Sequence, residues 1–226
     1  TASRKEYLLL WEEAKKVKSE NINNFEFKKN FKLNLNWYHD LALHTQVVKK
    51  KSKLNYMHGR LLYSTLRDYI QKISAQKQKP YLRILETGTA RGFSSLCMAK
   101  ALSDAECLGN IITLDIIPNE LKIFWNCIDD HEGKKTRLEL LNTWHDLVDK
   151  YITFVEGDSR NELSKISLSR INFAFLDGSH TYNDIMNEFN FIKNKQIKGD
   201  IIFFDDYNKA QFPGIIEAVD KICLHY

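Results

Sequence analysis

Several features that mark other protein classes are missing from this chain of 226 residues. It has no run of about 18 apolar residues, so no membrane-spanning helix is expected, and its first residues do not resemble a secretory signal peptide. The four cysteines form no CxxC pair, which argues against a zinc site or a disulfide framework. Internal repeats and low-complexity tracts are also absent. These absences predict reduced thiols and a cytoplasmic globular protein.

The formal net charge of +4 hides a marked asymmetry. Residues 1–80 contain 17 lysines and arginines against 7 acidic residues, whereas the rest contains 16 against 22. A lysine-rich solvated helical face is the simpler interpretation, and basic runs such as residues 49–51 favour it. The alternative is a basic cap that attracts an anionic substrate, such as a phosphorylated or nucleotide-linked molecule.

The hydrophobic pattern changes near residue 81. Before it, apolar residues recur at helical spacing, as in residues 6–17 and 57–73, and predict a helical segment. After it, apolar runs predict strands at 81–87, 110–116, 152–158, 171–177 and 200–206. Helical patterns separate them at 93–104, 119–130, 136–149 and 181–195, and one more follows at 212–226.

This alternation predicts an α/β fold of the Rossmann-like, doubly wound type, with a mostly parallel sheet and helices on both faces. We expect residues 1–80 to form an N-terminal helical cap on the substrate side. Residues 81–226 then form the ligand-binding domain.

Glycine is scarce, with nine residues, yet two glycines follow the first predicted strand closely. Gly88 and Gly92 stand where a backbone must approach a ligand or adopt a positive φ. The pattern G-x-A-x-G departs from the dinucleotide fingerprint G-x-G-x-x-G, because Phe93 occupies the region of its last glycine. A nicotinamide or flavin dinucleotide is therefore not expected.

The stretch from Glu86 to Gly92 resembles the E-x-G-x-G-x-G motif of class I S-adenosylmethionine-dependent methyltransferases, with Ala90 in place of the middle glycine. The resemblance implies that S-adenosyl-L-methionine is the cofactor. It also implies that Asp115 accepts hydrogen bonds from the ribose and that Asp158 and Ser159 approach the adenine. The implied cofactor-binding residues are Glu86, Gly88, Thr89, Ala90, Gly92, Asp115, Asp158 and Ser159. Taken singly, Asp115 and Asp158 can instead be turn formers at strand ends.

Three more carboxylates follow the last two predicted strands. Asp177 ends one strand, and Asp205 and Asp206 end the next. Because neighbouring parallel strands end at the same edge of a sheet, we expect these side chains to converge. Carboxylates that would otherwise repel one another suit a divalent cation, Mg²⁺ foremost, with Mn²⁺ or Ca²⁺ as alternatives.

These acids resemble the metal site of O-methyltransferases of the catechol type and of the macrolide-sugar and natural-product type. The resemblance covers residues 81–212 and implies that Asp177, Asp205 and Asp206 hold the metal. It also implies catalytic roles for Asp177 and for His180, three residues later, as the general base. Two simpler interpretations stay open: Asp177 serves the cofactor side alone, or His180 caps the following helix.

The sequence therefore predicts a methyltransferase that acts on a hydroxyl of a small molecule, such as a sugar, a glycoside or another secondary metabolite. A nucleic-acid methyltransferase is an alternative, but "DGSH" at 177–180 stands where amino-methylating enzymes of that kind carry a P-P dipeptide. A non-catalytic S-adenosylmethionine-binding module is the second alternative. No apolar run for the last two strands of the family sheet follows the helix that ends near residue 224, which predicts an exposed sheet edge and hence a homodimer or reduced stability.

Overall fold

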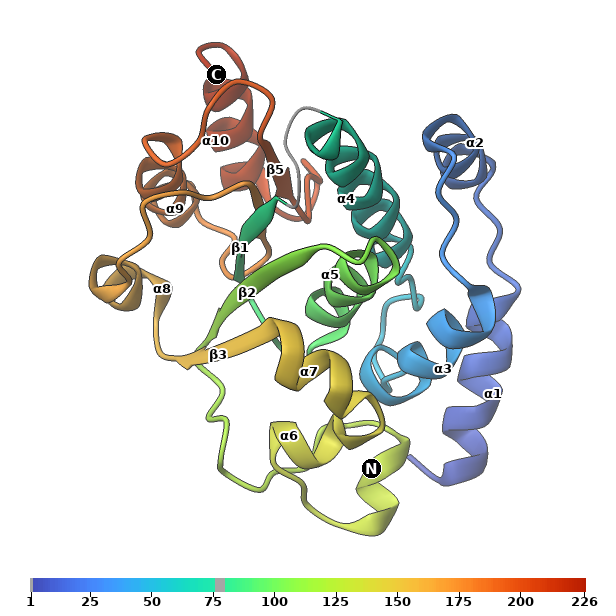
Figure 1. Cartoon of the computed structure of the whole chain (residues 1–226). Coiled ribbons are helices and arrows are strands. Elements are labelled where there is room, and N and C mark those ends of the chain that lie inside the picture. The colour runs from blue at the N-terminus through green and yellow to red at the C-terminus, as the bar shows by residue number, and fades with distance from the viewer. Residues whose placement is uncertain (1, 76–79) are drawn as a thin grey trace. The chain divides into compact units, whose positions relative to one another are not determined.

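The computed structural model describes residues 2–75 and 80–226 (Figure 1). Its contacts divide the chain into two compact units. The helical unit contains the described part of Thr1–Pro80 together with Arg91–Cys107 and Asn119–Lys150. The sheet unit contains Tyr81–Ala90, Leu108–Pro118 and Tyr151–Tyr226. The predicted division into a cap of residues 1–80 and a cofactor domain of residues 81–226 is a functional one and stays a prediction.

The helical unit begins with helices whose starts are set by polar caps. Ser3 and Glu6 form a reciprocal capping box, and the side chains of Ser19 and Asn34 accept backbone N–H groups at the next two starts. The predicted helical character of the N-terminal segment is confirmed, as is the helix over 93–104. The helices are α1 Arg4–Lys15, α2 Glu20–Lys29, α3 Leu35–Thr45, α4 His58–Ser74 and α5 Phe93–Asp104. The chain just before the change of pattern predicted near residue 81, at residues 76–79, lies outside the described residues.

The predicted helix over 119–130 is wrong. Irregular chain and the short 3₁₀ helix η1 Ile128–Glu132 occupy that region. Asp130 explains the difference: its carboxylate accepts hydrogen bonds from the backbone N–H groups of Trp125 (2.7 Å) and Asn126 (2.8 Å). These bonds satisfy donors that a helix would otherwise use, and Asn126 adopts a positive φ of 54°.

The predicted helix over 136–149 is interrupted rather than continuous. It consists of α6 Arg137–Leu140, the 3₁₀ helix η2 Asn142–Trp144 and α7 His145–Tyr151. A capping box of Thr136 and Glu139 begins the first piece, as the sequence pattern S/T-x-x-E favours.

All five predicted strands are confirmed, most of them slightly shorter than expected. They are β1 Tyr81–Thr87, β2 Leu108–Asp115, β3 Ile152–Glu156, β4 Phe173–Leu176 and β5 Ile201–Phe204. Every pairing is parallel and the strand order is β3-β2-β1-β4-β5, which confirms the Rossmann-like α/β fold. The order reverses between β1 and β4, so ligands are expected at the carboxyl ends of these two strands.

Apolar side chains hold the sheet unit together. One cluster joins the strands through Leu85, Leu114, Ala174 and Leu176, all of which are buried. A second cluster packs α9 Tyr182–Lys193 against α10 Pro213–Cys223, with Ile185 and Ile215 at its centre. The remaining helices of this unit are short: α8 Ser159–Glu162 and η3 Leu163–Lys165. This packing fixes the strand ends from which the candidate site is built.

Two absences hold for the described residues. None of their helices is both long enough and apolar enough to cross a membrane. The cysteines Cys97, Cys107, Cys127 and Cys223 are all free, as the lack of CxxC pairs predicts.

Candidate functional site

The carboxyl ends of the strands surround a cavity of about 400 Å³ in the sheet unit. Its lining comes from the segments that follow β1 (87–90), β2 (114–117), β3 (157–160) and β4 (177–179), together with Asp184 of α9. Of the predicted cofactor residues, Gly88, Ala90, Asp115, Asp158 and Ser159 line it, and so does Asp177. Glu86, Thr89 and Gly92 do not.

Those three residues have other positions. Glu86 is fully buried within β1. The Thr89 hydroxyl is also buried and bonds to the Thr113 hydroxyl at 2.6 Å. Gly92 belongs to the helical unit, where it begins α5 with a φ of 80°.

Gly88 makes the tightest backbone approach of the cavity wall. Its φ is +88°, and a Cβ built on it would overlap the carbonyl oxygen of Asp177. Its N–H donates to the Leu114 carbonyl oxygen at 2.9 Å, which ties the turn to β2. Only glycine fits this combination of positive φ and close contact, so the structure explains the first glycine of the pattern.

Ala90 and Asp115 meet across the turn. Ala90 adopts a left-handed φ of 45°, the conformation that the glycine in the family pattern adopts without strain. Its N–H donates to Asp115 Oδ2 at 2.5 Å, and the Ile117 N–H donates to Asp115 Oδ1 at 2.8 Å. Asp115 is thus both a turn former and a cavity-lining carboxylate, so the two interpretations of this residue are compatible.

Asp158 and Ser159 form the opposite part of the wall. Asp158 caps α8 by accepting the Arg160 N–H, and it pairs with the Arg160 guanidinium, which holds the pKa of Asp158 below its usual range. The Ser159 hydroxyl donates to Oε1 of Glu188 at 2.8 Å. Arg160 and Glu188 were not predicted as site residues.

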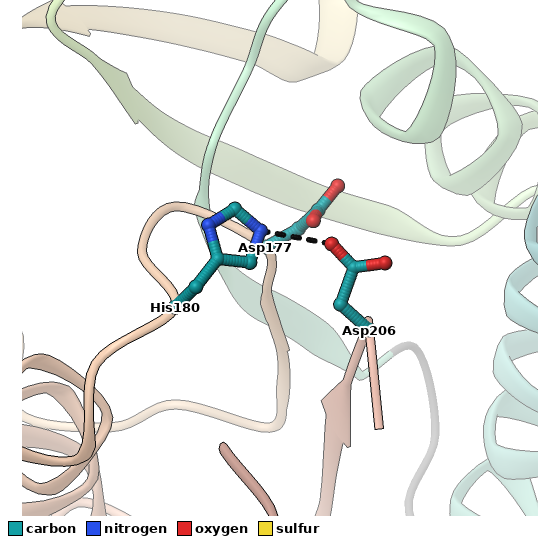
Figure 2. A group of neighbouring side chains, drawn as sticks. All are labelled: Asp177, His180 and Asp206. Carbon is teal, nitrogen blue, oxygen red and sulfur yellow. Dashed lines mark hydrogen bonds and ion pairs between the residues drawn. The ribbon is translucent and has the colours of Figure 1, made fainter. Parts of the chain in front are cut away.

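Asp177, His180 and Asp206 come together at the ends of β4 and β5, as Figure 2 shows. One potential ligand atom from each lies within 4.8 Å of the other two. His180 Nε2 pairs with Asp206 Oδ2 at 2.8 Å, and the imidazole stacks on the Phe212 ring with centroids 4.3 Å apart. Asp206 reaches this position with a strained φ of 54°. We call these three residues the acid–histidine trio.

The predicted metal set differs from the trio in one member. The sequence predicts Asp177, Asp205 and Asp206, whereas the structure groups His180 with Asp177 and Asp206 and leaves Asp205 outside. Asp205 still acts electrostatically. Burial, followed by the negative charges of Asp205 and Asp206, raises the pKa of Asp177 to about 9. A partly buried carboxylate with this surplus of negative charge fits a bound cation, and carboxylate oxygen donors suit Mg²⁺ or Mn²⁺.

The start of α9 tests the interpretation of His180 as a helix cap. The Thr181 hydroxyl accepts the Asp184 N–H at 3.2 Å and is therefore the helix cap. His180 precedes the cap and is not needed for it. Its side chain, 44% exposed, is directed to Asp206 instead. The simpler interpretation of His180 as a helix cap does not describe this structure.

Comparison with known proteins gives the family and the fold. Residues 85–207 match the methyltransferase domain family. A segment of 53 residues, 23% of the chain, is 40% identical to the uncharacterised protein R132 of Acanthamoeba polyphaga mimivirus and spans only 24% of that protein.

Two solved structures are similar to the chain at 17% identity, which shows the fold alone. The O-methyltransferase NovP has a TM-score of 0.56, with 81% of this chain and 78% of that chain covered. CalS11, described as a TDP-rhamnose 3'-O-methyltransferase of calicheamicin biosynthesis, has a TM-score of 0.53, with 91% and 87% covered.

Proposed function

The chain belongs to the methyltransferase domain family, and from that premise we propose that it is an S-adenosylmethionine-dependent O-methyltransferase of small molecules. Its acceptor is a hydroxyl of a sugar, a glycoside or another secondary metabolite. One observation carries the proposal: Asp177 lines the cavity and also belongs to the acid–histidine trio. A methyl donor in the cavity and an acceptor beside the trio would therefore lie next to each other at Asp177. NovP and CalS11, the two fold neighbours, are both described as O-methyltransferases.

The cofactor is held by residues that already line the cavity. Gly88 and Ala90 bring the backbone close, and Asp115 offers a carboxylate whose orientation two backbone N–H groups fix. Asp158 and Ser159 complete the opposite wall. We assign Glu86, Thr89 and Gly92 to support of the turn rather than to contact with the ligand.

His180 is the general base in this proposal. A hydroxyl is a weak nucleophile while it keeps its proton, and an imidazole within reach can accept that proton as a general base. The Asp206 carboxylate, 2.8 Å from Nε2, orients the ring and stabilises the imidazolium that forms. The Phe212 ring restricts the remaining rotation by stacking. These contacts hold the base in place before the acceptor binds.

A divalent cation is the second part of the proposal. Asp177 and Asp206 would hold it, with Asp205 adding negative charge from nearby. When bound, Mg²⁺ would lower the pKa of an acceptor hydroxyl and help to align it. The cap role of residues 1–80 on the substrate side stays a prediction. The cytoplasmic location and the homodimer stay predictions.

The test separates cofactor binding from catalysis. Transfer of labelled methyl groups from S-adenosylmethionine is measured on a panel of hydroxyl acceptors that includes TDP-rhamnose, with EDTA and then with added Mg²⁺. Binding of S-adenosylhomocysteine is measured by calorimetry. The variant His180→Ala should lower kcat by about 10²–10⁴-fold while changing the Kd of S-adenosylhomocysteine by less than about twofold.

His225→Ala, an exposed histidine at the end of α10, is the matched control and should leave both values unchanged. Equal losses of turnover and binding in His180→Ala would make the residue structural. A wild-type chain that does not bind S-adenosylhomocysteine would overturn the proposal as a whole, and turnover that EDTA leaves intact would overturn its metal part.

A further inference from the structure

Glu188 is a fully buried carboxylate that the proposed chemistry does not use. It lies on α9, and its two oxygens accept hydrogen bonds from two hydroxyl groups rather than from a lysine or an arginine. The Ser159 hydroxyl donates to Oε1 at 2.8 Å, and the Thr87 hydroxyl donates to Oε2 at 3.1 Å. Glu188 therefore bridges the end of β1 and the start of α8.

Both of its partners line the cavity. Thr87 immediately precedes Gly88 and is buried, whereas Ser159 immediately follows Asp158 and is partly exposed. A serine or threonine hydroxyl has one proton and two lone pairs. When that proton is given to Glu188, the oxygen can offer only lone pairs to a ligand.

We propose that Glu188 is a positioning residue of the cofactor cavity: the buried Thr87 hydroxyl holds its carboxylate in place, and the carboxylate sets the Ser159 hydroxyl as a hydrogen-bond acceptor toward the ligand. The inference rests on the proposed cofactor role of this cavity. S-adenosylmethionine and S-adenosylhomocysteine both carry amino and hydroxyl groups that can donate hydrogen bonds. A hydroxyl oxygen that is set as an acceptor can bind such groups. Glu188 does not touch the ligand in this arrangement and acts through the Ser159 hydroxyl.

Protonation of Glu188 would reverse the direction of its hydrogen bond with one of the hydroxyls. The pKa of Glu188 is raised to about 7: burial is the main cause, the two hydroxyls oppose it, and the carboxylates of Asp184 on the same helix and of Asp158 after β3 add to it. The Arg160 guanidinium faces Asp158 and Asp184. A protonated Glu188 donates to one hydroxyl oxygen, and that hydroxyl must then turn its own proton away. Ligand binding should therefore weaken as the pH falls through about 7.

The test uses Glu188→Gln, which keeps the shape and removes both the charge and the titration. Its amide donates to one of the two hydroxyls at every pH. Calorimetric titration with S-adenosylhomocysteine at about pH 8 should show about 3–10-fold weaker binding than the wild type, the worth of one hydrogen bond. The difference between wild type and variant should shrink at about pH 6, where the wild-type carboxyl is protonated as well. Titration of Asp177 contributes to both proteins and cancels in this difference.

Two further variants make the result specific. Glu217→Gln removes an exposed glutamate of α10 and should bind like the wild type at both pH values. Ser159→Ala removes the hydroxyl through which Glu188 acts, so the loss in the double variant should be smaller than the product of the single losses. If Glu188→Gln does not fold, Ser159→Ala alone should show a weaker pH dependence of binding than the wild type.

Failure of this inference and failure of the proposed function give different results. Wild-type protein that does not bind S-adenosylhomocysteine overturns both. Wild-type binding with an unchanged affinity and pH dependence in Glu188→Gln overturns the positioning role alone. Losses that multiply in the double variant also overturn it, because they mean that Glu188 and Ser159 act independently.

Discussion

At the scale of single residues, we expect an added side chain to lower the free energy of unfolding most at Gly88. The variant Gly88→Ala would place a Cβ against the carbonyl oxygen of Asp177 at a φ of +88°. We expect the free energy of unfolding to fall by about 3–5 kcal/mol, because backbone rather than a flexible side chain must move. Chemical denaturation measures this loss.

Gly199→Ala is the matched control for that variant. Gly199 also has a positive φ, +98°, but nothing lies within 4 Å of the position that an added Cβ would take, so only the backbone strain remains. This variant should lose about 1–2 kcal/mol. Equal losses at the two positions would mean that the contact between Gly88 and Asp177 is not a tight one.

Acids at strand ends were predictable and Glu188 was not. Asp115, Asp158 and Asp177 each follow an apolar run, so residue type and position together mark them. Glu188 lies inside an amphipathic helix, where a glutamate ordinarily faces water. A signal was present, since Glu188 shares the helical face of the buried Ile185 and Ile192. Its two hydroxyl partners come from distant parts of the chain, and no local pattern reveals them.

At the scale of elements, the cap of α9 supports the position of His180. Thr181→Ala removes the hydroxyl that accepts the Asp184 N–H, and we expect a loss of about 1 kcal/mol in the free energy of unfolding. Thr181→Ser keeps the hydroxyl and should remain within a few tenths of a kcal/mol of the wild type. A thermal or denaturant unfolding series compares the three proteins. A full loss in the serine variant would contradict the capping role.

Strands were predicted more reliably than the segment between β2 and β3. Buried parallel strands are continuous apolar runs, which the sequence displays directly. Residues 119–130 carry helix-like spacing, but Asp130 binds the backbone of Trp125 and Asn126 and holds the chain in an irregular path. A carboxylate that bonds to backbone four or five residues earlier leaves no periodic signal. The prediction of a helix there was wrong for this reason.

At the scale of the whole molecule, Glu188 should make stability depend on pH. Folding raises its pKa from 4.5 to about 7, so the folded state binds more protons than the unfolded state between these values. Stability attributable to this group is therefore greatest at low pH and is lost as the pH rises through about 7. Glu188→Gln cannot titrate and lacks this loss.

Denaturant titrations of both proteins measure the effect. Between about pH 4.5 and about pH 8, the wild type should lose up to about 3 kcal/mol of unfolding free energy relative to Glu188→Gln. Glu217→Gln should run parallel to the wild type. If the unfolding free energy of the wild type instead rises relative to that of Glu188→Gln as the pH increases, Glu188 is not a buried carboxylate without a cationic partner.

The division of the chain into units was the least predictable property. The change of pattern at residue 81 marks the start of β1, but Arg91–Cys107 and Asn119–Lys150 join the N-terminal helices in one compact unit. Such grouping depends on contacts between segments far apart in sequence. Hydrophobic periodicity can predict a helix, but it does not show which other segments that helix packs against.

The approach of Gly88 to Asp177 has a thermodynamic consequence. The Asp177 N–H also donates to the Thr87 carbonyl oxygen at 3.0 Å, so one hydrogen bond and the close approach of Gly88 hold the ends of β1 and β4 together. A molecule that shifts one loop must displace the other. Linkage then requires that whatever an acceptor does to the affinity for the methyl donor, the donor does in equal measure to the affinity for the acceptor.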